Sequence, residues 1–352
     1  MEVLDALRVV AGLPGDADDA ACAGAVDLVL SDDAEPGVRR VRRGRGFSFH
    51  LPDGTLLEGA DRQRCLDLAV PPAWEDVWIC VEERGHLQAT GRDDAGRKQY
   101  LYHASWRALR EAMKFSALPA FGAVLPDLRR RVDGDLRRPR LDRDRVLALV
   151  LALLDETLLR IGNEGHADEN GGHGLTTITG EHVEVGSTLT RFRFRGKSGV
   201  EQEVELRDRR LAHQLRRMDE ADQPQLLAWT EDGDTWRDVR AEDVNDHLRT
   251  ITGAPVSAKD FRTWGGSVTA LAALRHAPPT DDEREVQQQR IAAVDAAAEA
   301  LGNTRAVARS SYVHPAVLDI AGSNAVAAAY DDRDGVVDEL TPDERALLRL
   351  LT

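Results

Sequence analysis

The sequence predicts an α+β fold, in which a small β-rich N-terminal domain precedes a larger, mainly α-helical domain with a small antiparallel sheet. Between residues 38 and 106, short alternations of apolar and polar residues are separated by turns such as the one at residues 52–54. After residue 140, apolar-rich stretches of helical length replace this alternation. The 352 residues, 42% of them hydrophobic, suffice for one large or two ordinary domains.

Four segments are expected along the chain. They are an acidic, partly helical extension at residues 1–36, a β-rich domain at 37–115, a catalytic domain at 116–320 and an acidic C-terminal tail at 321–352, which we expect to be helical and peripheral. In the second segment, strands are expected at residues 45–50, 55–58, 77–81 and 99–103. Residues 107–140 carry a basic stretch, concentrated at positions 129–140, and are expected to include the connection between the domains.

The third segment opens with a helix and a hairpin. Residues 145–161 are apolar on nearly every face and predict a central helix with Arg160 at its C-terminal end. In residues 190–195 arginines alternate with Thr and Phe, and in residues 201–206 glutamates alternate with Gln, Val and Leu. The two segments predict a hairpin with matched cross-strand charges and with Lys197 at its tip. A solvated turn lysine is the plain alternative for Lys197.

Three helices are expected to follow the hairpin. Ser257 and Asp260 have the spacing of a capping box, so a helix should run from about residue 258 to 276. Arg262 lies near its first turn, where the helix dipole favours an anion. An alanine-rich helix at residues 281–301 and a short helix that reaches Tyr312 complete the series.

Composition restricts the classes of function. The three cysteines have no paired or metal-type spacing, which predicts a cytoplasmic protein without disulfides. The longest apolar run, residues 146–154, is too short to span a bilayer. A net charge of -15 opposes binding of nucleic acid, but residues 37–145 hold 22 Lys or Arg against 16 Asp or Glu. A basic region within an otherwise acidic chain is therefore expected.

The use of lysine points to one chemistry. Among 46 cationic residues lysine occurs only at positions 98, 114, 197 and 259. Because a guanidinium holds its proton too tightly to act as a general acid, Lys197 is a candidate proton donor. With Arg160, Arg262 and the phenol of Tyr312, it would supply what metal-free cleavage of a nucleic-acid strand needs.

The motifs around these residues resemble those of the type IB DNA topoisomerases, specifically the compact poxvirus-like enzymes found in bacteria. The resemblance covers roughly residues 38–320. It is carried by LRIGNE followed by GLTTI, by FRGKSGVEQEVEL, DVNDHLR, AKDFRTW and LGNTRAVARSSYVHP, and in the β-rich domain by LQATGRDDAGRKQYLYHASW. It implies a topoisomerase IB or tyrosine recombinase-like fold that closes as a clamp around double-stranded DNA. It also implies relaxation of supercoils without ATP, metal or another cofactor.

The resemblance also implies roles for residues. Tyr312 would be the nucleophile, Lys197 the general acid, and Arg160 and Arg262 would hold the scissile phosphate. Family members commonly have His nine positions before the tyrosine, and here that position is Asn303, which still donates a hydrogen bond but carries no charge. DNA contacts are expected from Lys98, Gln99, Tyr100, Tyr102, His166, Ser198 and Lys259. The plain alternative for the two tyrosines is packing in the β-core.

Two other functions remain open at this point. Tyrosine recombinases share the nucleophile, but they usually show His-x-x-Arg where this chain has residues 259–262, Lys-Asp-Phe-Arg. An inactive DNA-binding descendant is the second alternative, with Asn303 as its mark. Several carboxylates lie near His166 and His173 in the sequence, as in a cation site, but a polar loop is the better interpretation, and we expect no metal. The enzyme is expected to act as a monomer in the cytoplasm, at the nucleoid.

Overall fold

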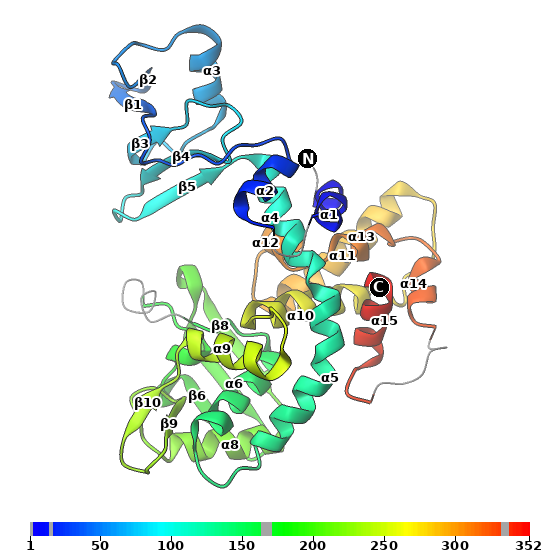
Figure 1. The fold of residues 1–352 in the computed structure, drawn as a ribbon. Coiled ribbons are helices and arrows are strands. Elements are labelled where there is room, and N and C mark those ends of the chain that lie inside the picture. Colours follow the sequence, from blue (N-terminus) through cyan, green and yellow to red (C-terminus); the bar gives the residue numbers. More distant parts are fainter. Residues whose placement is uncertain (1–2, 14–16, 163–170, 332–337) are drawn as a thin grey trace. The chain divides into compact units, whose positions relative to one another are not determined.

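The computed structural model describes residues 3–13, 17–162, 171–331 and 338–352 (Figure 1). The chain forms two compact units, Met1–Ser116 and Ala117–Thr352. The first unit combines an antiparallel sheet with helices, and helices dominate the second, as the α+β prediction requires. Among the described residues, no helix combines the length and the apolar character needed to cross a membrane.

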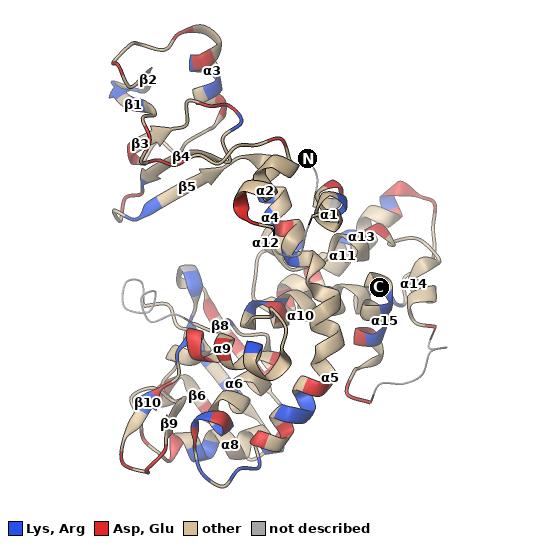
Figure 2. Cartoon of the chain, in the orientation of Figure 1, with Lys and Arg blue, Asp and Glu red and all other residues tan. Residues whose placement is uncertain are grey.

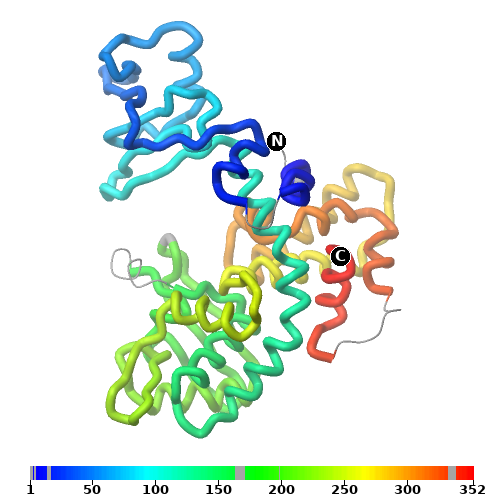
Figure 3. Tube along the Cα trace, in the orientation of Figure 1, coloured from blue at the N-terminus to red at the C-terminus, as the bar shows by residue number. Residues whose placement is uncertain are grey.

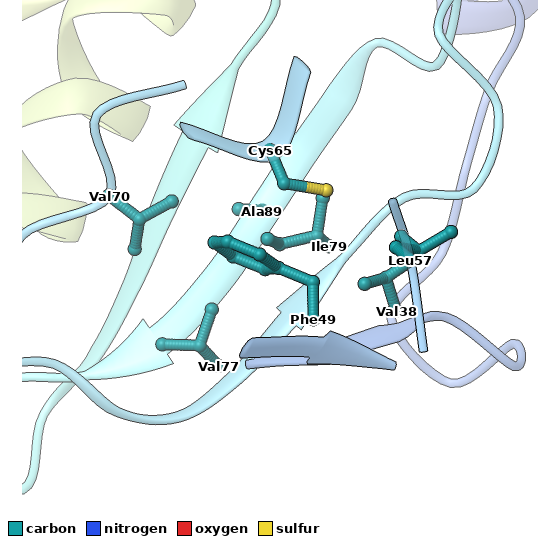
Figure 4. Packing of buried hydrophobic residues seen from close by; sticks show 8 residues of the cluster. All are labelled: Val38, Phe49, Leu57, Cys65, Val70, Val77, Ile79 and Ala89. Carbon is teal, nitrogen blue, oxygen red and sulfur yellow. The ribbon is translucent and has the colours of Figure 1, made fainter. Parts of the chain in front are cut away.

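The first unit is built on a five-stranded antiparallel sheet. Its strands are β1 (Val38–Arg43), β2 (Gly46–His50), β3 (Glu75–Ile79), β4 (Leu87–Arg92) and β5 (Lys98–Tyr102), in the order β2-β1-β3-β4-β5. One face packs Val77, Ile79 and Ala89 against Phe49 and against Cys65 of helix α3 (Gly59–Asp67) (Figure 4). The prediction located β2, β3 and β5 to within about two residues, but the strand predicted at residues 55–58 is not formed, and Leu56 makes an isolated bridge to His50. It missed β1, which is mostly arginine, and β4, which is buried along most of its length.

The residues before the sheet belong to this unit's core. Helices α1 (Val3–Ala11) and α2 (Asp19–Ala25) pack with α4 (Ala104–Ser116). Cys22 and Leu28 are buried against Trp106 and Leu109. Residues 1–36, expected as an appended extension, therefore supply part of the hydrophobic core.

The second unit is centred on α6 (Arg143–Thr157), which is surrounded by α5 (Leu118–Asp135), α9 (Ala241–Thr252) and α10 (Ala258–Leu274). The helix begins at Asp142, whose carboxylate accepts the N–H of Arg145. It ends four residues earlier than predicted. The Thr157 hydroxyl bonds the carbonyl of Leu153 and accepts the N–H of Leu159, so it replaces helical backbone bonds. Arg160 consequently lies beyond the helix rather than at its end.

A three-stranded sheet carries the predicted hairpin. Its strands are β6 (Val183–Val185), β7 (Thr190–Arg195) and β8 (Glu201–Leu206), in the order β6-β7-β8. Arg191 pairs with Glu205 at 2.8 Å and Arg193 with Glu203 at 2.9 Å, which confirms the matched charges. Helix α8 (Arg209–Asp219) and the short pair β9 (Ala228–Thr230) and β10 (Trp236–Asp238) follow.

The remaining helices are α11 (Glu283–Leu301), α12 (Arg305–Ser311), α13 (Pro315–Asp319), α14 (Ala325–Ala329) and α15 (Pro342–Leu351). Helix α15 lies against α5 and α10 (Figure 3). Its Leu347 is fully buried. Its Glu344 bonds Arg129 and accepts the indole N–H of Trp264. The C-terminal segment, predicted to be peripheral, is therefore part of the packed core.

The first arginines of the predicted basic connection lie within α5 and are paired with acids. Arg129 bonds Asp155, Arg130 bonds Glu339 and Arg131 bonds Asp135. Blue and red segments accordingly adjoin along the C-terminal half of α5 (Figure 2). The positive charge predicted here from the sequence is largely neutralised within the unit.

Candidate active site

Tyr312 lies where α12 ends, with 8% of its surface exposed. The helix begins at Thr304, whose side chain accepts the N–H of Val307, and the Tyr312 N–H closes its last turn on Ala308. The Ser267 hydroxyl of α10 donates to the carbonyl of Tyr312 at 3.1 Å. A Cβ at Gly266 would lie 2.9 Å from that carbonyl oxygen, so glycine permits the close approach of helix and tyrosine.

Arg262 reaches the phenol from α10. Its guanidinium carbon lies 4.9 Å from the centroid of the Tyr312 ring. One terminal nitrogen donates to the carbonyl of Leu158, and the other donates to the carbonyl of Leu301 at 3.0 Å. Both carbonyls lie where a helix ends, at positions that lack a helical partner and attract cations. The sequence analysis expected the dipole of the helix that carries Arg262 to favour an anion there. In the structure, carbonyls at the ends of α6 and α11 also hold the Arg262 side chain.

Arg160 and Asn303 meet beside this pair. The Nη2 of Arg160 donates to the Oδ1 of Asn303 at 2.6 Å, although the two residues are 143 positions apart. Within the described chain, the Nε of Arg262 and the Nδ2 of Asn303 are buried without a hydrogen-bond partner. A buried donor of this kind costs about 1–3 kcal/mol when it is left unpaired. The cluster therefore offers donors to an anionic ligand.

The electrostatics favour ionisation of the phenol. Burial raises the pKa of Tyr312, but the charge and hydrogen bond of Arg262 work against this. The charges of Arg160 and Lys259 act in the same direction, and the resulting pKa of Tyr312 lies below its ordinary value. A buried phenol with a lowered pKa is the form that a nucleophile requires.

The two lysines predicted to take part, Lys197 and Lys259, are exposed. Lys259 lies in the first turn of α10, three residues before Arg262, after a capping box in which the Ser257 N–H donates to Asp260 at 2.7 Å. Lys197 lies in the tight turn between β7 and β8, as predicted. The hairpin is anchored to the cluster through Gln202 of β8, whose side chain lies against Gly302, the neighbour of Asn303.

In the first unit, Lys98, Tyr100 and Tyr102 share one face of β5, opposite the hydrophobic core. Tyr100 is 49% and Tyr102 36% exposed, and their rings stack at 6.1 Å. They therefore do not pack in the β-core, which was the alternative. Gln99 points to the other face, and its amide donates to Asp93 at 2.9 Å.

An acidic segment crosses the same face of the sheet. Asp33 pairs with Lys98 at 2.7 Å and accepts the hydroxyl of Thr90, and the carbonyl of Glu35 accepts the indole N–H of Trp78. The hydrogen bond from Lys98 is the main reason that the pKa of Asp33 is lowered. We call residues 31–35 the acidic segment below. The sequence showed its charge but not its location.

Two predicted contacts have no structural account. His166 lies outside the described residues, and so does the side chain of Ser198. His173 is described, and its Nδ1 bonds the carbonyl of Thr177 at 2.7 Å. Among the described residues, no group of three or more His, Cys, Asp or Glu side chains is arranged to hold a metal ion.

Residues 103–331 match the family model of the eukaryotic DNA topoisomerase I catalytic core, a match that covers more than half of the chain. The chain belongs to the type IB DNA topoisomerases. Residues 46–93 of this topoisomerase also match the N-terminal domain of bacterial DNA topoisomerase IB. The enzyme therefore acts on DNA.

Viral enzymes are among the relatives of this topoisomerase. It is 28% identical over 296 residues to the DNA topoisomerase 1B of Acanthamoeba polyphaga mimivirus. The matched segment covers 82% of this chain and 88% of the relative. It is 22% identical over 252 residues to the DNA topoisomerase 1B of Vaccinia virus (strain Copenhagen), or 70% of this chain and 76% of the relative. All five candidate catalytic residues lie within the match to the catalytic core, whereas β5 and α15 lie outside both family matches.

Proposed function

We propose that this topoisomerase relaxes supercoiled DNA through a transient covalent bond between Tyr312 and one DNA strand. One observation carries the proposal: the Tyr312 ring lies 4.9 Å from the Arg262 guanidinium carbon, in a cluster where Arg160 bonds Asn303. Three segments that are distant in the sequence, around residues 160, 262 and 303–312, thus supply a nucleophile and its electrostatic partners at one place.

In the cleavage step, the Tyr312 phenolate attacks a phosphorus atom in line with the 5′-bridging oxygen. A phosphorus–oxygen bond to tyrosine forms, the bond to the 5′-oxygen breaks, and the phenolic proton passes to solvent. Arg160, Arg262 and Asn303 donate to the nonbridging oxygens, whose charge grows in the transition state. The buried, unpaired donors of Arg262 and Asn303 support these roles.

Lys197 protonates the departing 5′-oxygen, which would otherwise leave as a strongly basic alkoxide. Proton donation of this kind contributes on the order of 100- to 10,000-fold in rate. Lys197 lies at the hairpin tip and its side chain is exposed, so its ammonium can reach a bound strand and transfer a proton to it. While the 3′-phosphotyrosyl bond holds one end, the free end swivels, and the reverse reaction rejoins the strand. The covalent bond conserves the energy of the phosphodiester, so no ATP is consumed.

We further propose that Lys98, Tyr100 and Tyr102 contact the duplex from the first unit, and that Lys259 contacts a phosphate beside the active site. Exposed stacked phenols beside a lysine provide hydrogen bonds and charge for a DNA backbone. The expectations of a monomer and of a location at the nucleoid stay predictions, which sedimentation and fractionation would check.

Relaxation of supercoiled plasmid by the purified protein in EDTA tests the proposal. The wild-type protein should relax both positive and negative supercoils, and Tyr312→Phe should not. Tyr312→Phe should still bind DNA, because it keeps the ring. Activity retained by Tyr312→Phe would refute the role of the tyrosine. Absence of wild-type relaxation would favour the inactive descendant, and strand transfer between duplexes without relaxation would favour a recombinase.

A further inference from the structure

The side chain of Gln202 lies between two glycines, each of which directly precedes a residue of the proposed reaction. Gly196 precedes Lys197, and Gly302 precedes Asn303. A Cβ at Gly196 would lie 2.8 Å from the Cγ of Gln202. A Cβ at Gly302 would lie 2.7 Å from its Oε1 and 3.4 Å from its Cδ. The Gln202 side chain thus occupies the space beside both glycines. A side chain at position 196 or 302 would have to displace it.

Backbone hydrogen bonds fix the positions of both glycines. The Gly196 N–H donates to the carbonyl of Val200 at 2.8 Å and closes the hairpin turn. Gly302 ends α11 in the left-handed conformation, with φ of 58°, and its N–H donates to the carbonyl of Glu299. A shift of either glycine therefore carries the following catalytic candidate with it.

Gln202 is itself anchored in the sheet. It pairs in register with Phe194, which is buried. Among the described residues, the amide of Gln202 makes a single long hydrogen bond of 3.4 Å, to the carbonyl of Glu201. Its contact with the two glycines is therefore one of shape and volume rather than of hydrogen bonding.

We infer that Gln202 is a positioning residue that sets the separation between Lys197 at the hairpin tip and Asn303 at the junction of α11 and α12. The inference rests on the proposed roles of these two residues. Since Asn303 bonds Arg160, the spacing extends to the group that holds the phosphate. Shortening the side chain lets the hairpin tip move, and the ammonium of Lys197 is then displaced from the leaving oxygen.

Three variants separate this role from a general structural one. Gln202→Ala removes the spacer, Gln202→Met restores its length without the amide, and Glu203→Gln changes the next residue, which points to the other face and pairs with Arg193. Misplacing a reacting group by about 1 Å costs on the order of 100-fold, so Gln202→Ala should cleave about 10- to 100-fold more slowly. Gln202→Met and Glu203→Gln should stay within about threefold of the wild-type rate.

The deciding measurement compares single-turnover cleavage of two duplexes. One carries the natural 5′-bridging oxygen and the other a sulfur at that position. A thiolate, with a pKa of about 8.5 for a typical thiol, leaves without protonation. On the sulfur substrate Gln202→Ala should regain the wild-type rate. A Gln202→Ala defect that is equal on both substrates would overturn the inference, because a loss of folding or of phosphate binding slows both.

Lys197→Ala, tested on the same pair of duplexes, separates this inference from the proposed function. If sulfur does not rescue Lys197→Ala, the general-acid assignment itself fails. If sulfur rescues Lys197→Ala but not Gln202→Ala, only the positioning role fails. Should Gln202→Ala not fold, Gly196→Ala presses on the spacer from the opposite side. Residue 196 has φ of -93°, so alanine is not strained there, and the same sulfur-rescued defect is expected.

Discussion

Arg262 shows how single residues prepare the site for an anion. Two carbonyls at helix ends fix its guanidinium, and its buried Nε has no hydrogen-bond partner in the part of the chain that the structure describes. The sequence motifs identified this arginine, Arg160 and Tyr312. They did not identify the carbonyls of Leu158 and Leu301, because any residue type supplies a carbonyl. At Leu158 and Leu301 the sequence determines only where the helices α6 and α11 end.

Asn303 is predicted to contribute to transition-state binding although it is uncharged. Asn303→Ala removes the acceptor of Arg160 and a buried donor, so cleavage should slow about 100-fold, the lower value for loss of one such donor. Single-turnover cleavage of a DNA duplex measures this. DNA affinity should change little, since one neutral contact is lost. An unchanged cleavage rate would remove Asn303 from the site.

The lowered pKa of Tyr312 predicts a pH profile. Because the phenolate is the attacking form in the proposed mechanism, the cleavage rate should rise with pH to a plateau. The midpoint of this rise should lie below the ordinary tyrosine pKa of about 10. Lys259→Gln removes one of the charges that favour the phenolate, so it should raise the pKa of Tyr312 and move the midpoint to higher pH. Arg309→Gln, on the exposed side of α12, is the control and should leave the midpoint in place. A midpoint that does not move in Lys259→Gln contradicts this electrostatic account.

At the scale of elements, periodicity and capping signals predicted the hairpin and helices α6, α10, α11 and α12, but not helices α3, α4, α5, α8 and α9 or the contacts between elements. The capping box at Ser257 and the helix end at Gly302 are local chemistry and were found. The acidic segment bound to β5 and the docking of α15 depend on residues that are far apart in the sequence. Because both terminal segments are acidic, the sequence analysis predicted them to lie outside the core.

Asp33 is predicted to weaken DNA binding, because it pairs with a lysine that we expect to meet a phosphate. In Asp33→Asn the ammonium of Lys98 is released. Affinity for duplex DNA should rise, and the slope of log affinity against log salt should steepen by about one. Asp94→Asn removes the same charge from the neighbouring turn and serves as the control. Weaker binding by Asp33→Asn than by Asp94→Asn would show that Asp33 instead orients Lys98 for DNA.

Helix α15 is predicted to stabilise the second unit through Arg129. In Arg129→Met the carboxylates of Asp155 and Glu344 stay partly or fully buried without their partner, which typically costs about 3–5 kcal/mol. Arg130→Met removes a more exposed arginine of the same helix, and pairs at the surface contribute about 0–1 kcal/mol. Denaturant unfolding of the two variants should differ accordingly. Equal losses would mean that the buried network adds nothing to stability.

At the scale of the whole molecule, the chain forms two compact units, Met1–Ser116 and Ala117–Thr352, where the sequence suggested four segments. The assignment of the termini differed because burial depends on tertiary packing, and Leu347 and Cys22 are core residues in segments with acidic composition. The candidate active site combines residues from four separate segments, around positions 160, 197, 262 and 303–312. The order of the motifs suggested it, but which backbone groups hold these side chains depends on the folded structure.

The covalent bond between enzyme and DNA is the central claim, and its most direct test is to trap it. A duplex nicked just beyond the cleavage site loses its short 5′-hydroxyl fragment after cleavage, so rejoining fails and the adduct accumulates. Digestion and mass spectrometry should then find the nucleotide on Tyr312, and Tyr312→Phe should give no adduct. An adduct on another residue, or none with wild-type protein that binds the duplex, would contradict the account.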